Sequence, residues 1–132
     1  MKFPRVLLSA AALVSAILAQ SALADHHESH DKSIKALLVT GGCCHNYKAQ
    51  TDALKDGLKP YGEILWTVIN EGGRGTQAQI DLYKDPDWAK KFDVVVHNEC
   101  FANTKDEAYV KSITEAHKAG VPGVVIHCAM HT

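Results

Sequence analysis

The sequence predicts an α/β domain whose sheet is mostly parallel. Short apolar segments that suit strands alternate along the chain with segments whose apolar residues recur at helical spacing. The segments between successive strands are long enough for the helical crossovers that parallel strands require. One of the predicted strands, Asp93–Val96, also contains a continuous apolar run, which is typical of a sheet covered on both faces.

Residues 1–24 have the features of a secretory signal peptide. Two basic residues, Lys2 and Arg5, precede an apolar core over Val6–Ala19. The small residues of a cleavage site follow at Ala22–Ala24. The apolar core is shorter than the about 20 residues with which a helix crosses a membrane. We therefore expect cleavage near Ala24 and a secreted or periplasmic protein with no membrane span in the mature chain.

Residues 25–33 predict a flexible His-rich linker, because Asp25–Asp31 contains three histidines and three acidic residues. Residues 34–132 then suffice for one domain with one core. Without the signal peptide the chain has 12 basic and 15 acidic residues, a net charge of −3. Because this balance offers no basic stripe, we expect no nucleic-acid partner, and the oligomeric state stays open.

The segment Ile34–Tyr47 predicts a buried strand, a tight turn with two glycines and the start of a helix. Gly57 and Pro60 close that helix. Its inner face is predicted by residues that recur at helical spacing, namely Tyr47, Thr51, Leu54 and Leu58. A second strand follows at Glu63–Ile69, which is β-branched and aromatic, and we expect Trp66 to lie in the core.

The glycine-rich segment Glu71–Thr76 lacks the spacing of a phosphate-binding loop and predicts a plain turn. Residues 78–92 predict one or two short helices, and either Asp85 or Asp87 can cap the N-terminus of such a helix. The third strand, Asp93–Val96, comes next.

A second long helix is predicted over Thr104–Ala119, with Thr104 or Asp106 as its cap. Its inner stripe consists of Val110, Ile113 and Ala116 or His117, and His117 is expected to be a packed or solvent-edge residue. The fourth strand is predicted at Gly123–Ile126. Because a doubly wound sheet needs a covering helix after that strand, we expect a sequence truncated at its C-terminus.

Residues with chemical function follow three of the predicted strands. In an open parallel sheet ligands bind beyond the carboxyl ends of the strands, so these residues are expected to share one site. They comprise Cys43, Cys44, His45 and Asn46, then His97, Asn98, Glu99 and Cys100, and finally His127, Cys128, Met130 and His131.

Three kinds of chemistry are open to these residues. The first is a site for a divalent metal ion such as Zn²⁺. Its ligands would come together only in the folded chain, because the sequence has no CxxC or HExxH spacing. Its candidate ligands are His45, His97, His127 and His131, and Glu99 and the four cysteines are further suitable donors. The second is covalent catalysis by Cys128 as a nucleophile. It is disfavoured because Ile126 and Met130 are too large for the positions on either side of a nucleophile elbow.

The third kind of chemistry is disulfide formation, for which four cysteines permit three pairings. Adjacent Cys43 and Cys44 are not expected to pair, because the resulting ring is strained. The expected bond joins one of them to Cys100 or Cys128, and the alternative is buried free thiols that pack as small apolar groups.

Four segments also carry a resemblance to a known family: LLVTGGCCHNY, WTVINEGG, DPDWAKKFDVVVHNECFA and HKAGVPGVVIHCAMHT. They resemble the ThuA-like (trehalose utilisation) family of the class I glutamine amidotransferase-like superfamily, over about Ile34 to Thr132. The resemblance implies a flavodoxin-like three-layer α/β/α domain and a link to carbohydrate metabolism. Complete ThuA-like domains are considerably longer, so it also implies that residues 34–132 are the N-terminal part of such a domain.

The resemblance implies a sugar pocket at the three strand ends. In that superfamily the nucleophile is a cysteine at a strand elbow, where this chain has His127 with Cys128 beside it. His97, Glu99 and His127 are the expected proton-transfer residues. The expected ligand-binding residues are Gly41, Gly42, Cys44, His45, Asn98, Cys128 and His131.

Two main functions are therefore open. The protein is an exported enzyme that acts on a trehalose-type sugar or sugar derivative, or it is a non-catalytic carbohydrate-binding or accessory domain that uses the same pocket. A metal-binding protein is the remaining alternative.

Overall fold

The computed structural model describes residues 32–131. The predicted signal peptide at residues 1–24 and most of the predicted linker lie outside the described residues. None of the helices in the described part has the length and apolarity that a membrane crossing needs.

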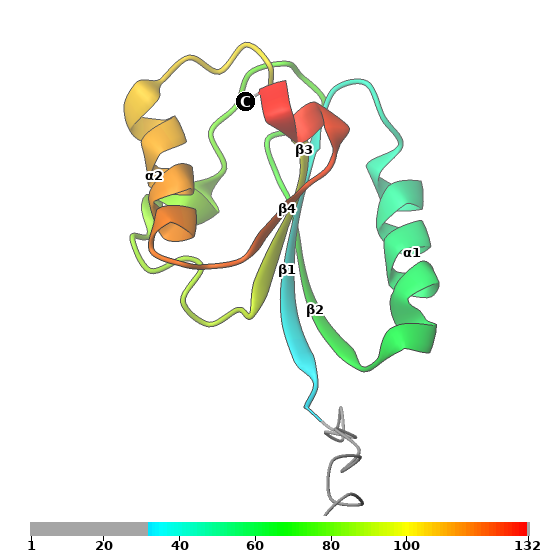
Figure 1. The fold of residues 1–132 in the computed structure, drawn as a ribbon. Coiled ribbons are helices and arrows are strands. Elements are labelled where there is room, and N and C mark those ends of the chain that lie inside the picture. Colours follow the sequence, from blue (N-terminus) through cyan, green and yellow to red (C-terminus); the bar gives the residue numbers. More distant parts are fainter. Residues whose placement is uncertain (1–31, 132) are drawn as a thin grey trace, which may run out of the picture.

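The centre of the fold is a sheet of four parallel strands in the order β2-β1-β3-β4. This arrangement confirms the predicted α/β class and parallel sheet (Figure 1). β1 and β3 occupy the middle, where both of their edges are hydrogen-bonded. The strands are β1 Ile34–Gly42, β2 Ile64–Asn70, β3 Val94–Cys100 and β4 Gly123–Val125.

Two long helices lie on opposite sides of this sheet (Figure 1). α1 Tyr47–Leu58 covers one side and continues into the 3₁₀ turn η1 Lys59–Tyr61. α2 Glu107–Lys118 covers the other side together with the short 3₁₀ helix η2 Asp81–Lys84. A further 3₁₀ turn, η3 His127–His131, follows β4.

The main core lies between the sheet and α2. Alternate residues of the central strands, Leu37, Val39 and Val95, point into it with the aromatic residues of the η2 region. Val110, Ile113 and Ala116 pack against this core, as predicted for the inner stripe of α2. The buried members are Leu37, Val39, Ile80, Tyr83, Trp88, Ala89, Val95, Phe101 and Tyr109.

Trp66 is not a core residue, contrary to the prediction. It is only half-buried, because β2 is an edge strand in which no residue is fully buried. The predicted end of β3 is also wrong, since the strand runs on through His97–Cys100. These four residues pair with Val39–Gly42 of β1, so backbone pairing continues past the apolar run.

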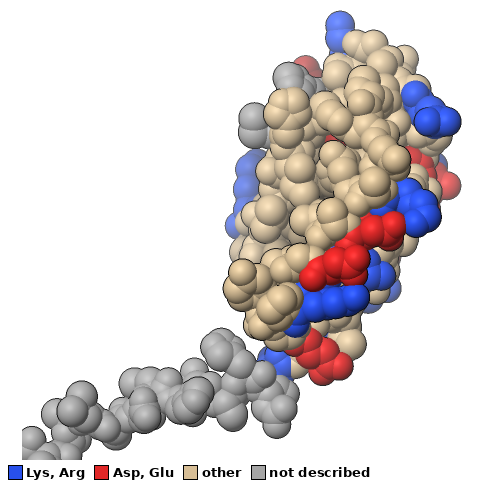
Figure 2. Space-filling view, turned by 90° about the vertical axis from the view of Figure 1, so that its right-hand side faces the viewer, with Lys and Arg blue, Asp and Glu red and all other residues tan. Residues whose placement is uncertain are grey.

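Charged side chains of both signs are mixed on the face that α1 covers (Figure 2). Two ion pairs there are Lys48 with Asp52 and Lys59 with Asp56, each 2.7 Å long. Because these pairs are solvent-exposed, they contribute little to stability. On this face neither sign forms a continuous stripe.

We expect the substitution Asp106→Ala to lower the free energy of unfolding by about 1 kcal/mol. Oδ1 of Asp106 accepts hydrogen bonds from the amides of Ala108 (3.0 Å) and Tyr109 (3.1 Å) and so caps α2. Thr104, the other predicted cap, bonds instead to the backbone of Ala78.

Urea denaturation measures this change in unfolding free energy. The control is Asp56→Ala, which removes an exposed ion pair of α1 without touching a cap and should not destabilise the protein. Equal losses in the two variants would contradict the capping role.

Candidate functional site

The end of β3 distributes its polar side chains between the two faces of the sheet. Successive strand residues point to opposite faces, so His97 and Glu99 lie on the α2 side. Asn98 lies on the α1 side, where its amide Nδ2 donates to Gln50 Oε1 over 3.3 Å. Cys100 lies on the same side, next to Cys43. The single site expected from the sequence is therefore two sites.

The first site, here called the carboxylate site, consists of Tyr83, His97, Glu99 and His117. The Tyr83 hydroxyl donates to Glu99 Oε1 over 2.7 Å, and His97 Nδ1 lies 2.9 Å from the same oxygen. Burial, followed by the charge of Glu99, raises the pKa of Tyr83 far above its ordinary value. The Tyr83 hydroxyl therefore remains a donor to the carboxylate at all ordinary pH values.

His117 extends this site toward solvent. Its Nε2 lies 2.9 Å from His97 Nε2, and its Nδ1 lies 2.8 Å from the carbonyl oxygen of Val121. The sequence predicted only a packed or solvent-edge role for His117. No local signal marks its bond to His97, because the two residues come from α2 and β3.

The polar contacts of the carboxylate site form one continuous chain. It runs from the Val121 carbonyl oxygen through His117 and His97 to the carboxyl group of Glu99. A carbonyl only accepts, so His117 Nδ1 donates to Val121. The Tyr83 hydroxyl lies 3.2 Å from His97 Nδ1 and so contacts both members of the His97–Glu99 pair.

A cavity of about 500 Å³ opens beside the carboxylate site, between α2 and β4. His97, Glu99 and His117 supply its polar wall, and its other walls are largely apolar. Glu99 Oε2 is buried and makes no hydrogen bond within the described residues. An unpartnered buried oxygen costs stability, so this atom is a natural acceptor for a ligand hydroxyl. The remaining lining residues are Val110, Ile113, Thr114, Val121, Gly123, Val125 and Ala129.

The second site, here called the thiol site, contains all four cysteines. Cys43 and Cys44 form a disulfide with each other, so the prediction that adjacent cysteines would not pair is wrong. The chain turns sharply here, with positive φ angles at Gly42 (96°) and Cys44 (82°), and this turn brings the two side chains together. Cys100 and Cys128 are free thiols.

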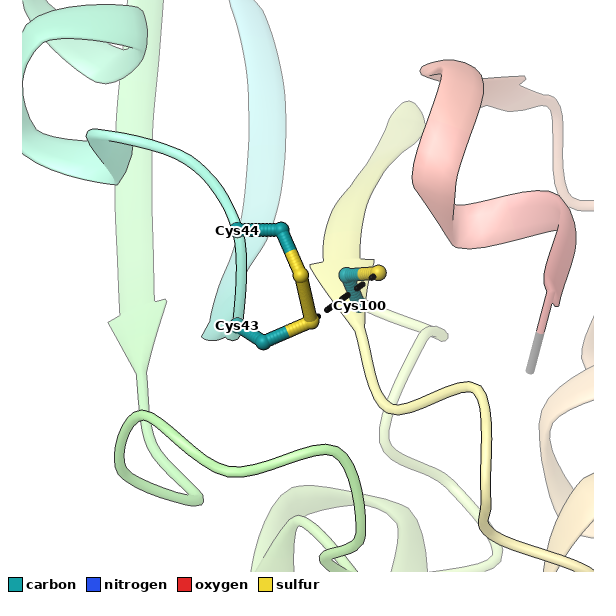
Figure 3. A group of neighbouring side chains, drawn as sticks. All are labelled: Cys43, Cys44 and Cys100. Carbon is teal, nitrogen blue, oxygen red and sulfur yellow. Dashed lines mark hydrogen bonds between the residues drawn. A yellow bond between two sulfur atoms is a disulfide. The ribbon is translucent and has the colours of Figure 1, made fainter.

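The free thiol of Cys100 lies next to the disulfide. Its Sγ is 3.9 Å from Cys43 Sγ (Figure 3). Burial, followed by a hydrogen bond with the Cys128 thiol, raises the pKa of Cys100 to about 11. Cys100 is therefore a protonated thiol at neutral pH.

His127 joins the thiol site. The potential ligand atoms of His45, His127 and Cys128 lie within 4.8 Å of one another, and His45 Nε2 is 3.1 Å from Cys128 Sγ. His97 has both ring nitrogens engaged in the carboxylate site. The described side chains thus do not form the predicted four-histidine metal set. Instead, two other groups have potential ligand atoms close enough to share a metal ion. One consists of His45, His127 and Cys128, and the other consists of three cysteines, Cys43, Cys44 and Cys100.

A second cavity, of about 700 Å³, borders the thiol site. It is lined by the segment Gly41–Lys48 and by Asn70, Gly73 and Arg74. The predicted plain turn at Glu71–Thr76 therefore also forms part of a pocket wall. This turn is held against β1 by a hydrogen bond from the Gly42 amide to the Gly73 carbonyl oxygen (3.0 Å).

The predicted site residues divide as follows. His97 and Glu99 belong to the carboxylate site. Asn98 belongs to neither site and forms its hydrogen bond with Gln50 of α1. The side chain of His131 lies outside the described part. The others lie at the thiol site, namely Gly41, Gly42, Cys44, His45, His127 and Cys128.

Comparisons of the chain with models of protein families, with curated proteins and with solved structures found no match. The chemistry of the two sites therefore carries the functional proposal.

Proposed function

We propose that this protein is an exported ThuA-like domain with a flavodoxin-like arrangement, and that it acts on a trehalose-type sugar or sugar derivative at the carboxylate site. The observation that carries the proposal is Glu99, which lines the 500 Å³ cavity and whose buried Oε2 has no hydrogen-bond partner among the described residues. Sugar hydroxyls donate to such an oxygen, and the C–H faces of a sugar ring suit the apolar walls.

The hydrogen-bonded pair of His97 and Glu99 supports a catalytic role. His97 Nδ1 lies 2.9 Å from Glu99 Oε1, and an imidazole next to a carboxyl group can accept a proton from a sugar hydroxyl or return one to a sugar oxygen. His117 is half-buried and orients His97 through the contact between their Nε2 atoms. Tyr83 fixes the carboxylate by donating to the other oxygen, Oε1, and is a positioning residue.

Trehalose is the probe for this proposal. We expect Glu99→Gln to slow its conversion about 10²- to 10⁴-fold, because an amide neither accepts nor returns the proton. Affinity should stay within about tenfold, because the amide oxygen still accepts a hydroxyl hydrogen bond. Proton NMR of the reaction measures turnover without assuming a product, and calorimetry measures affinity.

The matched control is Glu115→Gln, which makes the same change on the exposed side of α2. It should leave both quantities unaltered. A wild-type protein that binds trehalose without converting it, and that loses affinity in Glu99→Gln, would instead support the carbohydrate-binding alternative. Equal turnover in wild type and Glu99→Gln would remove the carboxylate site from the reaction.

A further inference from the structure

We propose that the thiol site is a redox-gated metal site. When the Cys43–Cys44 disulfide is reduced, Cys43, Cys44 and Cys100 bind one thiophilic metal ion. The three sulfur atoms already lie within 4.8 Å of one another, which is close enough to share one ion (Figure 3). This inference goes beyond the proposed sugar chemistry, which uses residues on the opposite face of the sheet.

The backbone holds these sulfur ligands in place before any ion binds. Gly42 is the register partner of Cys100 across the two central strands. The amide of Cys43 donates to the carbonyl oxygen of Cys100 over 3.3 Å. Cys100 is the last residue of β3, and Cys43 directly follows β1 and is tied to β3 by this bond. Ligands held in this way lose little conformational freedom on binding, which favours a defined metal site.

The ligand type selects the class of metal. Sulfur is the only donor in this group, and thiolates favour soft or borderline cations such as Cu⁺, Zn²⁺ and Cd²⁺ over Mg²⁺ or Ca²⁺. Cys100 is buried, whereas Cys44 is exposed and lines the 700 Å³ cavity. An ion therefore has an entry path to a site that is shielded on its inner side.

The gate is the disulfide bond itself. A small dithiol transfers two electrons and two protons to the bond, so that Cys43 and Cys44 become thiols and the reductant becomes a cyclic disulfide. Metal binding then releases the thiol protons to solvent. In the oxidised protein Cys100 is the one remaining thiol of the three, and a single ligand holds the ion only weakly.

Cadmium titration of the mature full-length chain tests this proposal. The oxidised protein and a dithiothreitol-reduced, anaerobically desalted sample are compared by ultraviolet thiolate-to-cadmium absorption. Any ion that Cys128 binds together with His45 and His127 contributes equally to both samples. We expect the reduced protein to bind one further equivalent, at least about 100-fold more tightly than the oxidised protein binds an ion at Cys100. A thiol assay should count two free thiols before reduction and four afterwards.

Two variants that each lose one cysteine locate the ion. Cys100→Ala should weaken binding by the reduced protein at least about 100-fold, whereas Cys128→Ala should change it by less than about threefold. Circular dichroism checks that each variant is folded, and the comparison of oxidised with reduced wild type needs no variant. Equal affinity in the two redox states, four thiols before reduction, or loss of binding in Cys128→Ala alone would overturn the proposal.

Discussion

Gly42→Ala is expected to lower the free energy of unfolding by about 3 kcal/mol or more. Gly42 has a φ of 96°, which is unfavourable for any residue with a side chain. A Cβ at this position would lie 2.1 Å from the carbonyl oxygen of Cys100 and 2.8 Å from its carbonyl carbon. Both atoms are backbone of the neighbouring central strand, so no change of side-chain rotamer relieves the overlap.

Urea denaturation measures the stability change, and Gly57→Ala is the matched control. Gly57 lies in α1, and a Cβ there would meet no atom within 4 Å. Because alanine favours helix, the control should gain about 0.5–1 kcal/mol. A Gly42→Ala protein as stable as the wild type would show that β1 and β3 do not approach as described. The variant should also lose cadmium affinity, since the overlap separates Cys43 from Cys100.

Phe101→Ala is expected to cost about 3–5 kcal/mol of unfolding free energy. Phe101 directly follows β3 and is fully buried in the main core. A Cβ on Gly72 would lie 2.4 Å from the tip of the Phe101 ring, so the ring packs directly against the glycine-rich turn. Removing the ring leaves a cavity and takes away the surface on which this turn rests.

Thermal or urea unfolding measures the loss, and trypsin cleavage after Arg74 reports on the turn. We expect faster cleavage at Arg74 in Phe101→Ala than in the wild type under folding conditions. The control is Tyr61→Ala, which removes an aromatic ring that is 83% exposed and should change stability by less than about 0.5 kcal/mol. Unchanged cleavage together with unchanged stability would contradict the packing of Phe101 against the turn.

The elements that form the core could be predicted from the sequence. α1 begins at Tyr47 as the helical spacing indicates, and α2 lies within the predicted Thr104–Ala119. The strands β1 and β3 begin where their apolar runs begin. These predictions succeed because an element that buries one face needs apolar residues at regular spacing, and this spacing is visible in the local sequence.

The end of β3 could not be predicted in the same way. His97–Cys100 is polar and has no β-branched residue, so local propensity places the end of the strand before it. Pairing with Val39–Gly42 of β1 keeps it extended, and that pairing joins residues far apart in the chain. The division of the polar residues between two faces of the sheet follows from this longer strand. It could not be predicted either, because it depends on the same pairing of distant residues.

The disulfide and the role of His117 also depend on distant contacts. Ring strain argues against a bond between adjacent cysteines in an extended chain, but Cys44 has a positive φ in the turn that follows β1. His117 is helical and gives no sign of its partner. Only the folded chain brings it to His97 and to the Val121 carbonyl.

The extended geometry of β3 also limits how this protein can change during evolution. Because side chains alternate along a strand, inserting or deleting one residue between Val94 and His97 would shift the register and turn the next residues over. His97 and Glu99 would then face α1 and the cysteines, while Asn98 and Cys100 would enter the main core. Both sites would be lost in one step, although no functional residue had been substituted. A change of two residues would keep these side chains on their faces, although it would still move the register of β3 against β1. A length change in the turn at Glu71–Thr76 does not reverse the faces of β3.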